Sequence, residues 1–364
     1  MRICLFIVHS FGGGAEQIAL TVLHALDRRR FFPIVACLHP LEAWRKALPN
    51  HIECLMPESK SIIAYMHFWR RLFVLAQKAD IVIGSLELQS LFAAALLARG
   101  KAIGWVHKDV QGYFLSTSMG HRVLYTLLLR LALRRCRQII CVSDGVQQAL
   151  STLCPRARAK ICRIYNPVPL DTIKKLGQEK LAPELQACFA RPVILAVGRL
   201  APEKQFDELI KAFHLLRQRG LVAHLCILGE GAERHTLEQL RHQLGRDEDV
   251  FLPGHTMPYA AMARARLCVL SSRFEGLPTV IIEALALGRP FVSTDCPSGP
   301  RELLANGTYG QLVPLHTNLA PLLAKALAAA LTQPETVEAC EARQHWAEQF
   351  SKEKVVKIWE NLLQ

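Results

Sequence analysis

Short, nearly continuous apolar runs alternate with helical patterns along this chain, and this alternation restricts the possible folds most strongly. The first run is residues 2–8, Arg-Ile-Cys-Leu-Phe-Ile-Val. Strands that are apolar at consecutive positions are typical of parallel sheets covered by helices on both faces. Strands alternating with helices therefore predict a doubly wound α/β fold. Further runs of this first set lie at 32–38, 52–55, 80–84, 101–106 and 137–142.

The pattern stops near Pro167 and Pro169 and then starts again, which indicates two domains. The prolines fix an extended segment, and the residues from Lys174 to Arg191 are mostly polar. A chain of 364 residues is also too long for one ordinary core. We predict domains at residues 1–170 and 171–345. The second set of strand-like runs lies at 193–197, 225–228, 250–252, 267–270 and 290–294.

The composition describes a globular and basic protein. Hydrophobic residues make up 51% of the chain, charged residues 21%, and the formal net charge is +13. This charge fits nucleic acid, an anionic membrane surface or phosphorylated substrates as partners. No aromatic-rich basic motif supports nucleic acid, so we expect no nucleic-acid partner.

The twelve cysteines do not form a pattern typical of zinc or of disulfides. No Cys-x2-Cys pair occurs, and Cys4, Cys37, Cys141, Cys226 and Cys268 lie inside apolar runs. We expect free thiols in a reducing cytosol and no bound metal. No apolar run approaches the roughly 20 residues of a spanning helix, and the apolar run at the start is too short for a signal peptide. The sequence thus predicts a soluble, cytoplasmic protein.

The stretch from Ser271 to Glu283 predicts an anion site. It follows the apolar run 267–270, turns at Glu275-Gly276 and opens a helix, with Leu277 next and Pro278 at the expected first helical position. Free N–H groups and the positive end of the helix dipole converge there. Glu275 and Glu283 flank the site, and Glu283 lies one turn beyond Thr279. Carboxylates accept hydrogen bonds from sugar hydroxyls, so a ligand with phosphate and sugar is indicated. For either glutamate alone a simpler interpretation applies: Glu275 would interact favourably with the helix dipole, and Glu283 would be a solvated helix residue.

Other candidates lie where further strands are expected to end, because ligands of such folds gather at the carboxyl ends of the strands. Arg199 follows Gly198, and Lys204 comes shortly after, so both cations can meet phosphate oxygens. The loop Gly12-Gly13-Gly14 allows a ligand close to the backbone but is not a dinucleotide fingerprint. His107 follows 101–106; on sequence alone it is more simply a structural polar group. Ser143 and Asp144 are more simply a helix cap.

Residues 111–135 combine a polar loop with a basic helix. The helix carries six aliphatic residues, together with Arg122, Arg130, Arg134 and Arg135. Such a helix can lie on an anionic bilayer. The alternative, which we favour on sequence, is that its leucines pack on the sheet while its arginines face water.

A series of motifs in the second half resembles glycosyltransferase family four, retaining enzymes of the GT-B fold. The motifs are Gly-Arg-Leu-x-x-Glu-Lys at 198–204, Leu-Gly-Glu-Gly at 228–231, Pro-Gly at 253–254, Glu-Gly-Leu-Pro-Thr-x3-Glu at 275–283, Cys-Pro-Ser-Gly-Pro-Arg-Glu at 296–302 and Gly-Thr-Tyr-Gly-Gln-Leu-Val-Pro at 307–314. The first half resembles the family more loosely. The resemblance implies two Rossmann-like domains facing across a cleft, with residues 346–364 crossing back to the first domain.

The resemblance also assigns roles. It implies an acceptor-binding first domain and a second domain that binds a nucleotide-diphosphate sugar. Arg199 and Lys204 would contact the diphosphate, Glu283 the ribose and Glu275 the donor sugar. His107 would lie near that sugar and, with Glu275, Arg199 and Lys204, form the catalytic set. The remaining expected donor contacts are Gly13, Gly14, Gly198, Gly254, Gly276, Leu277, Pro278 and Thr279.

The implied reaction is transfer of a hexose or N-acetylhexosamine, with UDP as the expected nucleotide, to a lipid-linked, lipopolysaccharide or capsule glycan. No cofactor is expected. The single Asp-x-Asp triplet, Asp247-Glu248-Asp249, precedes a strand at its amino end, so we interpret it as a solvated acidic loop and expect no metal. We also expect peripheral contact with an anionic inner-membrane face. Two alternatives stay open: a sugar-nucleotide enzyme of the epimerase type, and a sugar-nucleotide binding protein without turnover.

Overall fold

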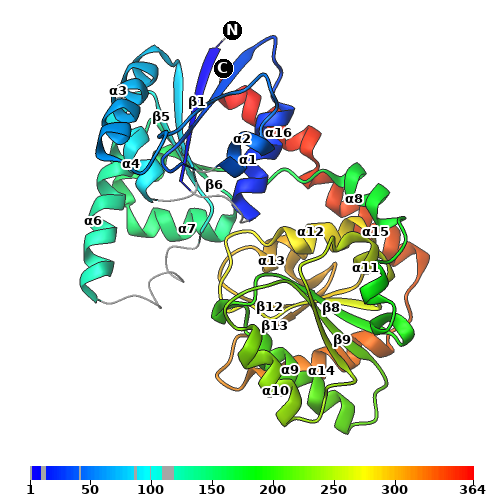
Figure 1. The fold of residues 1–364 in the computed structure, drawn as a ribbon. Coiled ribbons are helices and arrows are strands. Elements are labelled where there is room, and N and C mark those ends of the chain that lie inside the picture. Colours follow the sequence, from blue (N-terminus) through cyan, green and yellow to red (C-terminus); the bar gives the residue numbers. More distant parts are fainter. Residues whose placement is uncertain (1, 10–13, 41, 86–87, 99, 109–118) are drawn as a thin grey trace. The chain divides into compact units, whose positions relative to one another are not determined.

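The computed structural model describes residues 2–9, 14–40, 42–85, 88–98, 100–108 and 119–364, which form two compact units. Unit 1 comprises Met1–Val168 with Lys352–Gln364, and unit 2 comprises Pro169–Ser351. The predicted α/β class is confirmed, because each unit is built on one parallel sheet with helices on both faces (Figure 1).

The seven strands of unit 1 have the order β3-β2-β1-β4-β5-β6-β7, and all their pairings are parallel. The order along the chain reverses between β1 and β4, and in open α/β sheets such a reversal marks where ligands bind. The strands are β1 (Arg2–Val8), β2 (Phe31–Cys37), β3 (Glu53–Leu55), β4 (Ile81–Ser85), β5 (Ala102–Val106), β6 (Gln138–Cys141) and β7 (Ile161–Arg163).

The helices of unit 1 divide between the two faces of its sheet. Figure 1 shows α3, α4 and α6 on one face and α1 with α16 on the other. Helix α16 returns from the end of the chain: the Glu360 carboxylate accepts from the Asp27 amide at 2.8 Å, and Trp359 packs edge-on against Trp105 of β5. The helices are α1 (Gly14–Ala25), α2 (Glu42–Ala47), α3 (Ile62–Lys78), α4 (Leu88–Leu97), α6 (Met119–Arg135), α7 (Asp144–Leu153) and α16 (Lys352–Leu362).

Unit 2 has six parallel strands in the order β10-β9-β8-β11-β12-β13. Helices α9, α10 and α14 cover one face, while α8, α11, α12 and α15 lie on the other (Figure 1). The strands are β8 (Val193–Val197), β9 (His224–Leu228), β10 (Val250–Gly254), β11 (Leu267–Leu270), β12 (Phe291–Thr294) and β13 (Gln311–Val313). The helices are α8 (Leu170–Gly177), α9 (Phe206–Gln218), α10 (Arg234–Gln243), α11 (Tyr259–Arg264), α12 (Thr279–Ala286), α13 (Pro300–Leu303), α14 (Leu319–Thr332) and α15 (Val337–Ala347).

The second division between the units lies after Ser351 instead of after residue 345, because residues 346–351 belong to the packing of unit 2. Trp346 donates from Nε1 to the Leu303 carbonyl at 2.8 Å and stacks on Tyr309. Glu348 forms an ion pair with Lys174 at 2.8 Å. From Lys352 onward the chain belongs to unit 1 again.

Helix α6 differs from the interpretation that the sequence favoured. Its buried residues are Leu129, Ala132 and Leu133, near its carboxyl end. Val123, Leu124, Leu127 and Leu131 are exposed, so much of its apolar surface does not pack on the sheet. The loop of residues 111–118 that precedes the helix lies outside the described residues.

Most of the cysteines are buried. All twelve cysteines are free thiols, and burial raises the pKa of Cys37 to about 11 and, as the main cause, that of Cys268 to about 12. Within the described ranges, no helix is both long and apolar enough to cross a membrane.

The burial of Trp359 predicts how strongly α16 holds unit 1 together. Its side chain is fully buried, so Trp359→Ala should lower the free energy of unfolding by about 3–5 kcal/mol through lost burial and a cavity. Urea denaturation measures this loss. Ile358→Ala, at a half-exposed neighbour on the same helix, is the control and should change stability little. Equal effects of the two substitutions would contradict the packing described for α16.

Candidate active site

The candidate site of unit 2 lies where the strand order reverses. β8 and β11 pair directly, with Ile194 opposite Leu267 and Ala196 opposite Val269. Their carboxyl ends therefore deliver Gly198-Arg199 and the loop Ser271–Glu275 to the same edge of the sheet. In open α/β sheets this reversal is where ligands bind, because the flanking loops diverge there.

Lys204 and Glu275 form the central ion pair of this edge. The Lys204 ammonium lies 2.5 Å from Oε1 of Glu275, and the Ser272 hydroxyl donates to the same oxygen at 2.6 Å. Both charged side chains are largely buried, at 19% and 12% exposure. A cation held in this way is oriented before any ligand arrives, so little side-chain entropy is lost on binding.

Hydrogen bonds to backbone carbonyls join the two loops that carry this pair. The Ser271 hydroxyl donates to the Lys204 carbonyl at 2.6 Å, and the Arg273 amide donates to the Glu203 carbonyl at 2.8 Å. Lys204 ends a single 3-10 turn, Pro202–Lys204, and Gln205 then adopts a left-handed conformation with φ of 48° before α9 begins. The α-helix therefore does not begin at Pro202, because Gln205 separates this turn from α9.

Arg199 lies at the same edge but is much more open to solvent. Its guanidinium pairs with Glu203 at 2.7 Å, while 73% of its side chain remains exposed. Burial acts to raise the pKa of the Glu203 carboxyl, but the hydrogen bond from Arg199, a backbone hydrogen bond and the charges of Arg199 and Lys204 together lower the pKa below its usual value. The structure thus places both cations at this edge, with Arg199 largely exposed and Lys204 held by Glu275.

Glycines let the loops after β8 and β9 approach each other closely. At Gly229, with φ of 151°, a Cβ would lie 1.9 Å from the Gly198 carbonyl oxygen; at Gly231 it would lie 2.2 Å from that of Leu200. The aliphatic part of Lys204 passes Gly198, 3.5 Å from where a Cβ would stand. The sequence analysis identifies the Leu-Gly-Glu-Gly motif but does not name Gly229 and Gly231 as site residues. The motif itself could have indicated this close approach of the loops.

Gly254 supports this loop from the next strand. Its carbonyl accepts from the Gly229 amide at 2.9 Å, and with φ of 95° a Cβ there would lie 2.8 Å from Oε1 of Glu230. Glu230 is held by Arg234 at 2.5 Å. The structure therefore gives Gly254 a backbone-packing role, and its contact with a donor stays a prediction.

Helix α12 begins one residue later than the sequence predicts. Thr279 is the first helical residue, and Pro278 is the cap before it, with φ of −73° and ψ of 97°. Leu277 is buried, and Gly299, with φ of 96°, passes so close that a Cβ would lie 2.4 Å from Cδ of Pro278. The correction moves Pro278 out of the helix but leaves the turn Gly276–Thr279 at the helix start.

Glu283 lies one turn into α12 in a poorly solvated position. Burial raises its pKa to about 7, although a hydrogen bond from Thr279 acts to lower it. The phenol of Tyr259 is affected in turn: burial, and then the nearby Glu283, raise its pKa. A carboxyl with this pKa changes charge in the physiological range, so its hydrogen bonding to a ligand depends on pH.

Two buried hydroxyls were missed by sequence reasoning. Ser272 contacts Glu275 as described, and the Thr294 hydroxyl at the end of β12 donates to the Ser272 carbonyl at 2.6 Å. Both residues are fully buried. Polar residues at the ends of apolar strands were the available signal, since a buried hydroxyl needs a partner.

His107 belongs to unit 1, at the end of β5. It is buried, and its Nε2 lies 3.5 Å from the hydroxyl of Ser85, which ends the neighbouring strand β4. Burial, and then the charge of Lys108, lower the pKa of His107 to about 3, so the ring is neutral. Its Nδ1 has no hydrogen-bond partner among the described residues. Gly14 begins α1 in the same unit, and Gly13 lies outside the described residues.

The Asp-x-Asp triplet precedes β10, as predicted, but Asp249 is not solvated. Its carboxylate is buried and pairs with Arg217 at 3.0 Å and Arg246 at 3.2 Å. Asp247 pairs with Arg241 and His242 at 3.1 and 2.9 Å. The triplet is therefore engaged in structural ion pairs. Across the described part of the chain, no group of three or more His, Cys, Asp or Glu side chains is arranged to hold a metal ion.

Comparison with known families identifies the family of this chain. The model of "Glycosyl transferases group 1" matches residues 179–350, and that of "Glycosyltransferase Family 4" matches residues 12–172. The chain belongs to glycosyltransferase family four. The resemblance stated from the motifs is thereby confirmed.

Individual relatives and structures support the same placement of this family-four chain. An uncharacterized glycosyltransferase of Haemophilus influenzae is 28% identical over 98% of this chain and 99% of its own length. The Campylobacter jejuni N-acetylgalactosamine-N,N'-diacetylbacillosaminyl-diphospho-undecaprenol 4-alpha-N-acetylgalactosaminyltransferase is 38% identical, over 42% of this chain and 40% of that protein. Anabaena HepE, solved with UDP and glucose, has a TM-score of 0.81 at 22% identity, covering 100% of this chain and 99% of that chain, which confirms the GT-B fold.

The raised pKa of Glu283 predicts how the stability of this glycosyltransferase depends on pH. The folded protein keeps the proton up to about pH 7, whereas the unfolded chain releases it near pH 4.3, so stability falls as pH rises through this window. Glu283→Gln removes that loss, so its stabilising effect at pH 8 should exceed its effect at pH 4 by roughly 3 kcal/mol.

Thermal denaturation across this pH range measures the effect. Glu341→Gln, at an exposed position on α15, is the control and should give no such pH-dependent gain. A Glu283→Gln effect of the same size at pH 4 and pH 8 would show that Glu283 titrates normally.

Proposed function

We propose that this protein transfers a hexose or N-acetylhexosamine from a nucleotide-diphosphate sugar, with UDP as the nucleotide, to a lipid-linked, lipopolysaccharide or capsule glycan. The observation that carries the proposal is the preorganised Lys204–Glu275 pair beside Arg199 at the reversal of the unit 2 sheet. This edge combines cations for phosphate with carboxylates for sugar hydroxyls.

The chemistry assigned to the cations follows from charge development. Breaking the anomeric bond leaves negative charge on the diphosphate, and fixed cations aimed at that charge lower the barrier. Lys204 is held by Glu275 and can share its ammonium with a phosphate oxygen. Arg199 is exposed and can move from Glu203 to the same diphosphate. In this proposal the turn Gly276–Thr279 adds backbone N–H groups at the start of α12.

The carboxylates take the sugar side of the donor. Glu283 in its ionised form accepts hydrogen bonds from the ribose, and Glu275 contacts the hydroxyls of the transferred sugar. We propose retention of the anomeric configuration, with the leaving phosphate as base. The roles of His107, Gly13 and Gly14 toward the donor stay predictions, as does that of Gly198.

The acceptor and the place of action are proposed from two features. The Campylobacter relative carries diphospho-undecaprenol in its name, which favours a lipid-linked acceptor for this chain. The basic helix α6 exposes Val123, Leu124, Leu127 and Leu131, which favours peripheral contact with the cytoplasmic face of an anionic inner membrane.

One assay separates this proposal from its two alternatives. The protein is incubated with radiolabelled UDP-sugars and a membrane lipid extract, and the lipid and nucleotide fractions are analysed. Transfer gives label in lipid, whereas an epimerase gives an altered nucleotide sugar. A binding protein without turnover changes neither fraction, and that result would contradict the proposed transfer.

Donor kinetics test the division of labour between cations and carboxylate. Charge-assisted hydrogen bonds are worth roughly 1.5–3 kcal/mol each, so Glu283→Gln should raise the donor KM by about 10- to 100-fold. Arg199→Ala and Lys204→Ala should also lower kcat, because their interaction strengthens in the transition state. Lys211→Ala, which removes a cation of α9 paired with Asp207 and Glu208, is the control and should leave both constants unchanged. If Arg199→Ala and Lys204→Ala raised KM alone, the assignment of the cations would be wrong.

Metal removal is a separate prediction. Lys204, Arg199 and the helix start would supply the positive charge, and the Asp-x-Asp carboxylates are paired with arginine and histidine side chains. Transfer should therefore proceed at an unchanged rate after treatment with EDTA. Activity that disappears in EDTA and returns with Mg²⁺ or Mn²⁺ would contradict a metal-independent mechanism.

A further inference from the structure

Helix α3 of unit 1 carries a stripe of large apolar side chains that nothing in the described structure covers. Ile62, Met66, Trp69 and Phe73 are exposed by 80%, 67%, 41% and 51%. Their spacing of four, three and four residues places them on one face of the helix. This is the spacing of a buried helix face, yet it is exposed here.

The stripe is not the face by which α3 packs on its own unit. That face is formed by Phe68, Leu72 and Ala76, which are buried. Ser61 fixes the start of the helix, because its hydroxyl accepts from the Ala64 amide at 3.2 Å. The helix is therefore well defined without the stripe, and contiguous exposed apolar surface of this kind marks an interaction site.

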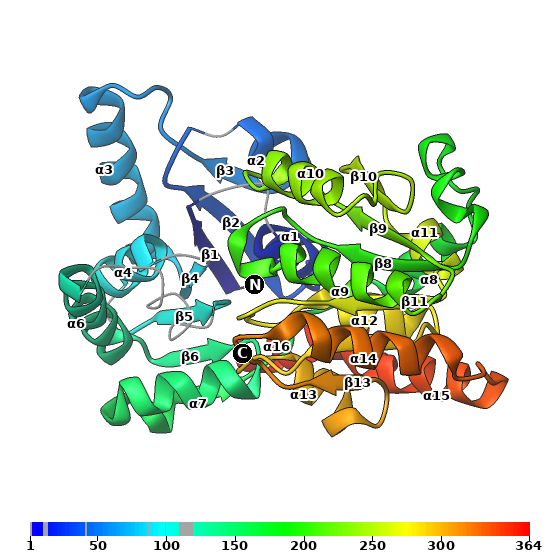
Figure 2. The same ribbon diagram turned by 90° about the horizontal axis from the view of Figure 1, so that it is seen from below.

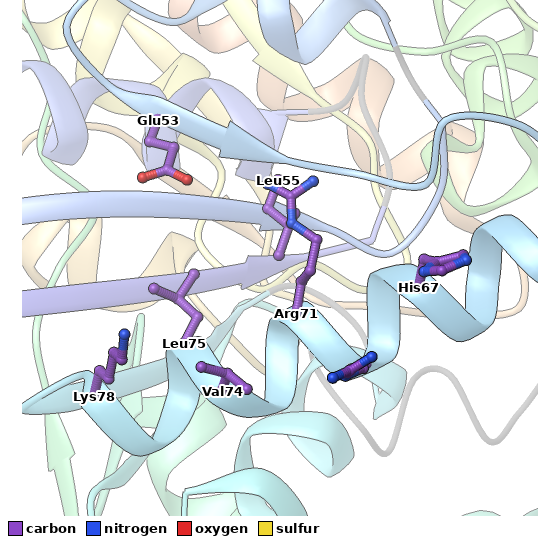
Figure 3. Close-up of a pocket in the computed structure, with 8 residues that line it drawn as sticks. Glu53, Leu55, His67, Arg71, Val74, Leu75 and Lys78 are labelled. Atoms are coloured by element: carbon purple, nitrogen blue, oxygen red, sulfur yellow. The ribbon is translucent and has the colours of Figure 1, made fainter.

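Another face of the same helix is basic, and of its cations Arg70 lies next to the stripe. His67, Arg70, Arg71 and Lys78 line a cavity of about 370 Å³ together with Glu53 and Leu55 of β3. Figure 3 shows Arg71 extending from α3 toward Leu55 of the strand. Arg70, Arg71 and Lys78 form no ion pair with any described residue, so their charges are available to an anion.

Neighbouring helices of unit 1 also expose apolar side chains. Helix α4 packs between α3 and α6, and Figures 1 and 2 show this arrangement from two directions. Leu96 of α4 is half-exposed, and α6 adds the four aliphatic side chains named above. Three neighbouring helices thus expose apolar side chains interspersed with arginine and lysine.

We propose that α3 is a membrane-docking helix, whose apolar stripe enters the interface of an anionic bilayer while Arg70, Arg71 and Lys78 bind lipid phosphates. Large apolar side chains and unpaired cations on the same exposed helix match the layered chemistry of such a bilayer, with acyl chains beneath anionic headgroups. This inference rests on the membrane association proposed above and assigns it to a specific helix and to anionic lipid.

The intrinsic fluorescence of Trp69 tests the proposal directly. It is the exposed tryptophan, whereas Trp44, Trp105 and Trp359 are buried and Trp346 is partly buried. Vesicles of phosphatidylglycerol and phosphatidylcholine with brominated acyl chains should quench Trp69 and shift its emission to the blue. Trp69→Phe should still bind these vesicles but lose the quenched component. Binding with no quenching of Trp69 would overturn the proposal while leaving membrane association intact.

Vesicle co-sedimentation with charge-matched variants supplies the second measurement. Arg70→Gln/Arg71→Gln/Lys78→Gln should weaken binding to anionic vesicles by at least about tenfold, since each surface cation contributes several-fold. The control removes three exposed cations of unit 2, in Lys180→Gln/Arg219→Gln/Lys325→Gln, and should bind nearly as the wild type does. Equal losses in both variants would mean that net charge alone attracts the protein, which overturns a specific role for α3.

A matched pair of triple variants tests the apolar stripe. Ile62→Ser/Met66→Gln/Phe73→Ser should abolish quenching of Trp69, whereas Val222→Ser/Met257→Gln/Val337→Ser changes exposed apolar residues of unit 2 and should not. Sedimentation in solution without lipid checks the competing occupant. A dimer that the stripe substitutions dissociate, with no vesicle binding by the wild type, would assign the stripe to a second copy and overturn the proposal. Glycosyl transfer to a water-soluble acceptor would be unaffected by either outcome.

Discussion

The parallel pairing of β8 with β11 is the contact on which the candidate site depends. It joins two strands that are far apart in sequence, and it places Lys204 and Glu275 within 2.5 Å of each other. The hydroxyls of Ser271 and Ser272 then fix the loops that carry them. A partly buried ion pair has to be well satisfied, because each charge loses water on folding. Here the carboxylate has two donors, so the ammonium keeps a defined position.

The same arrangement explains why Lys204 and Arg199 are suited to different tasks. Lys204 is oriented by Glu275 and is mostly shielded from solvent, whereas Arg199 is largely exposed beside Glu203. In the proposed mechanism, a diphosphate recruits Arg199 from solvent and meets Lys204 in the position where Glu275 holds it. The glycines at 229 and 231 serve this geometry, because a side chain at either position would force the loops after β8 and β9 apart.

The sequence predicts the fold well because its signals are local, and it names residues that the structure brings together at the edge formed by β8 and β11, whose roles toward a donor stay predictions. Apolar runs mark most strands within one or two residues, and the motif from Glu275 to Glu283 lies on one strand–turn–helix unit. The start of α12, the break at Gln205 and the buried state of Asp249 could not be predicted, since each depends on contacts with distant segments. The exposure of the leucines of α6 could not be predicted for the same reason. Periodicity gives a helix an apolar face but does not say what covers that face. The stripe on α3 is visible only when burial is known.

The central claim is that the edge formed by β8 and β11 holds the diphosphate of a nucleotide sugar. A crystal structure of the protein with UDP bound tests it most directly. The account predicts phosphate oxygens within hydrogen-bond distance of Lys204 and Arg199, and ribose hydroxyls at the Glu283 carboxylate. A nucleotide bound elsewhere, with the Lys204–Glu275 pair unchanged and no phosphate near it, would contradict the account.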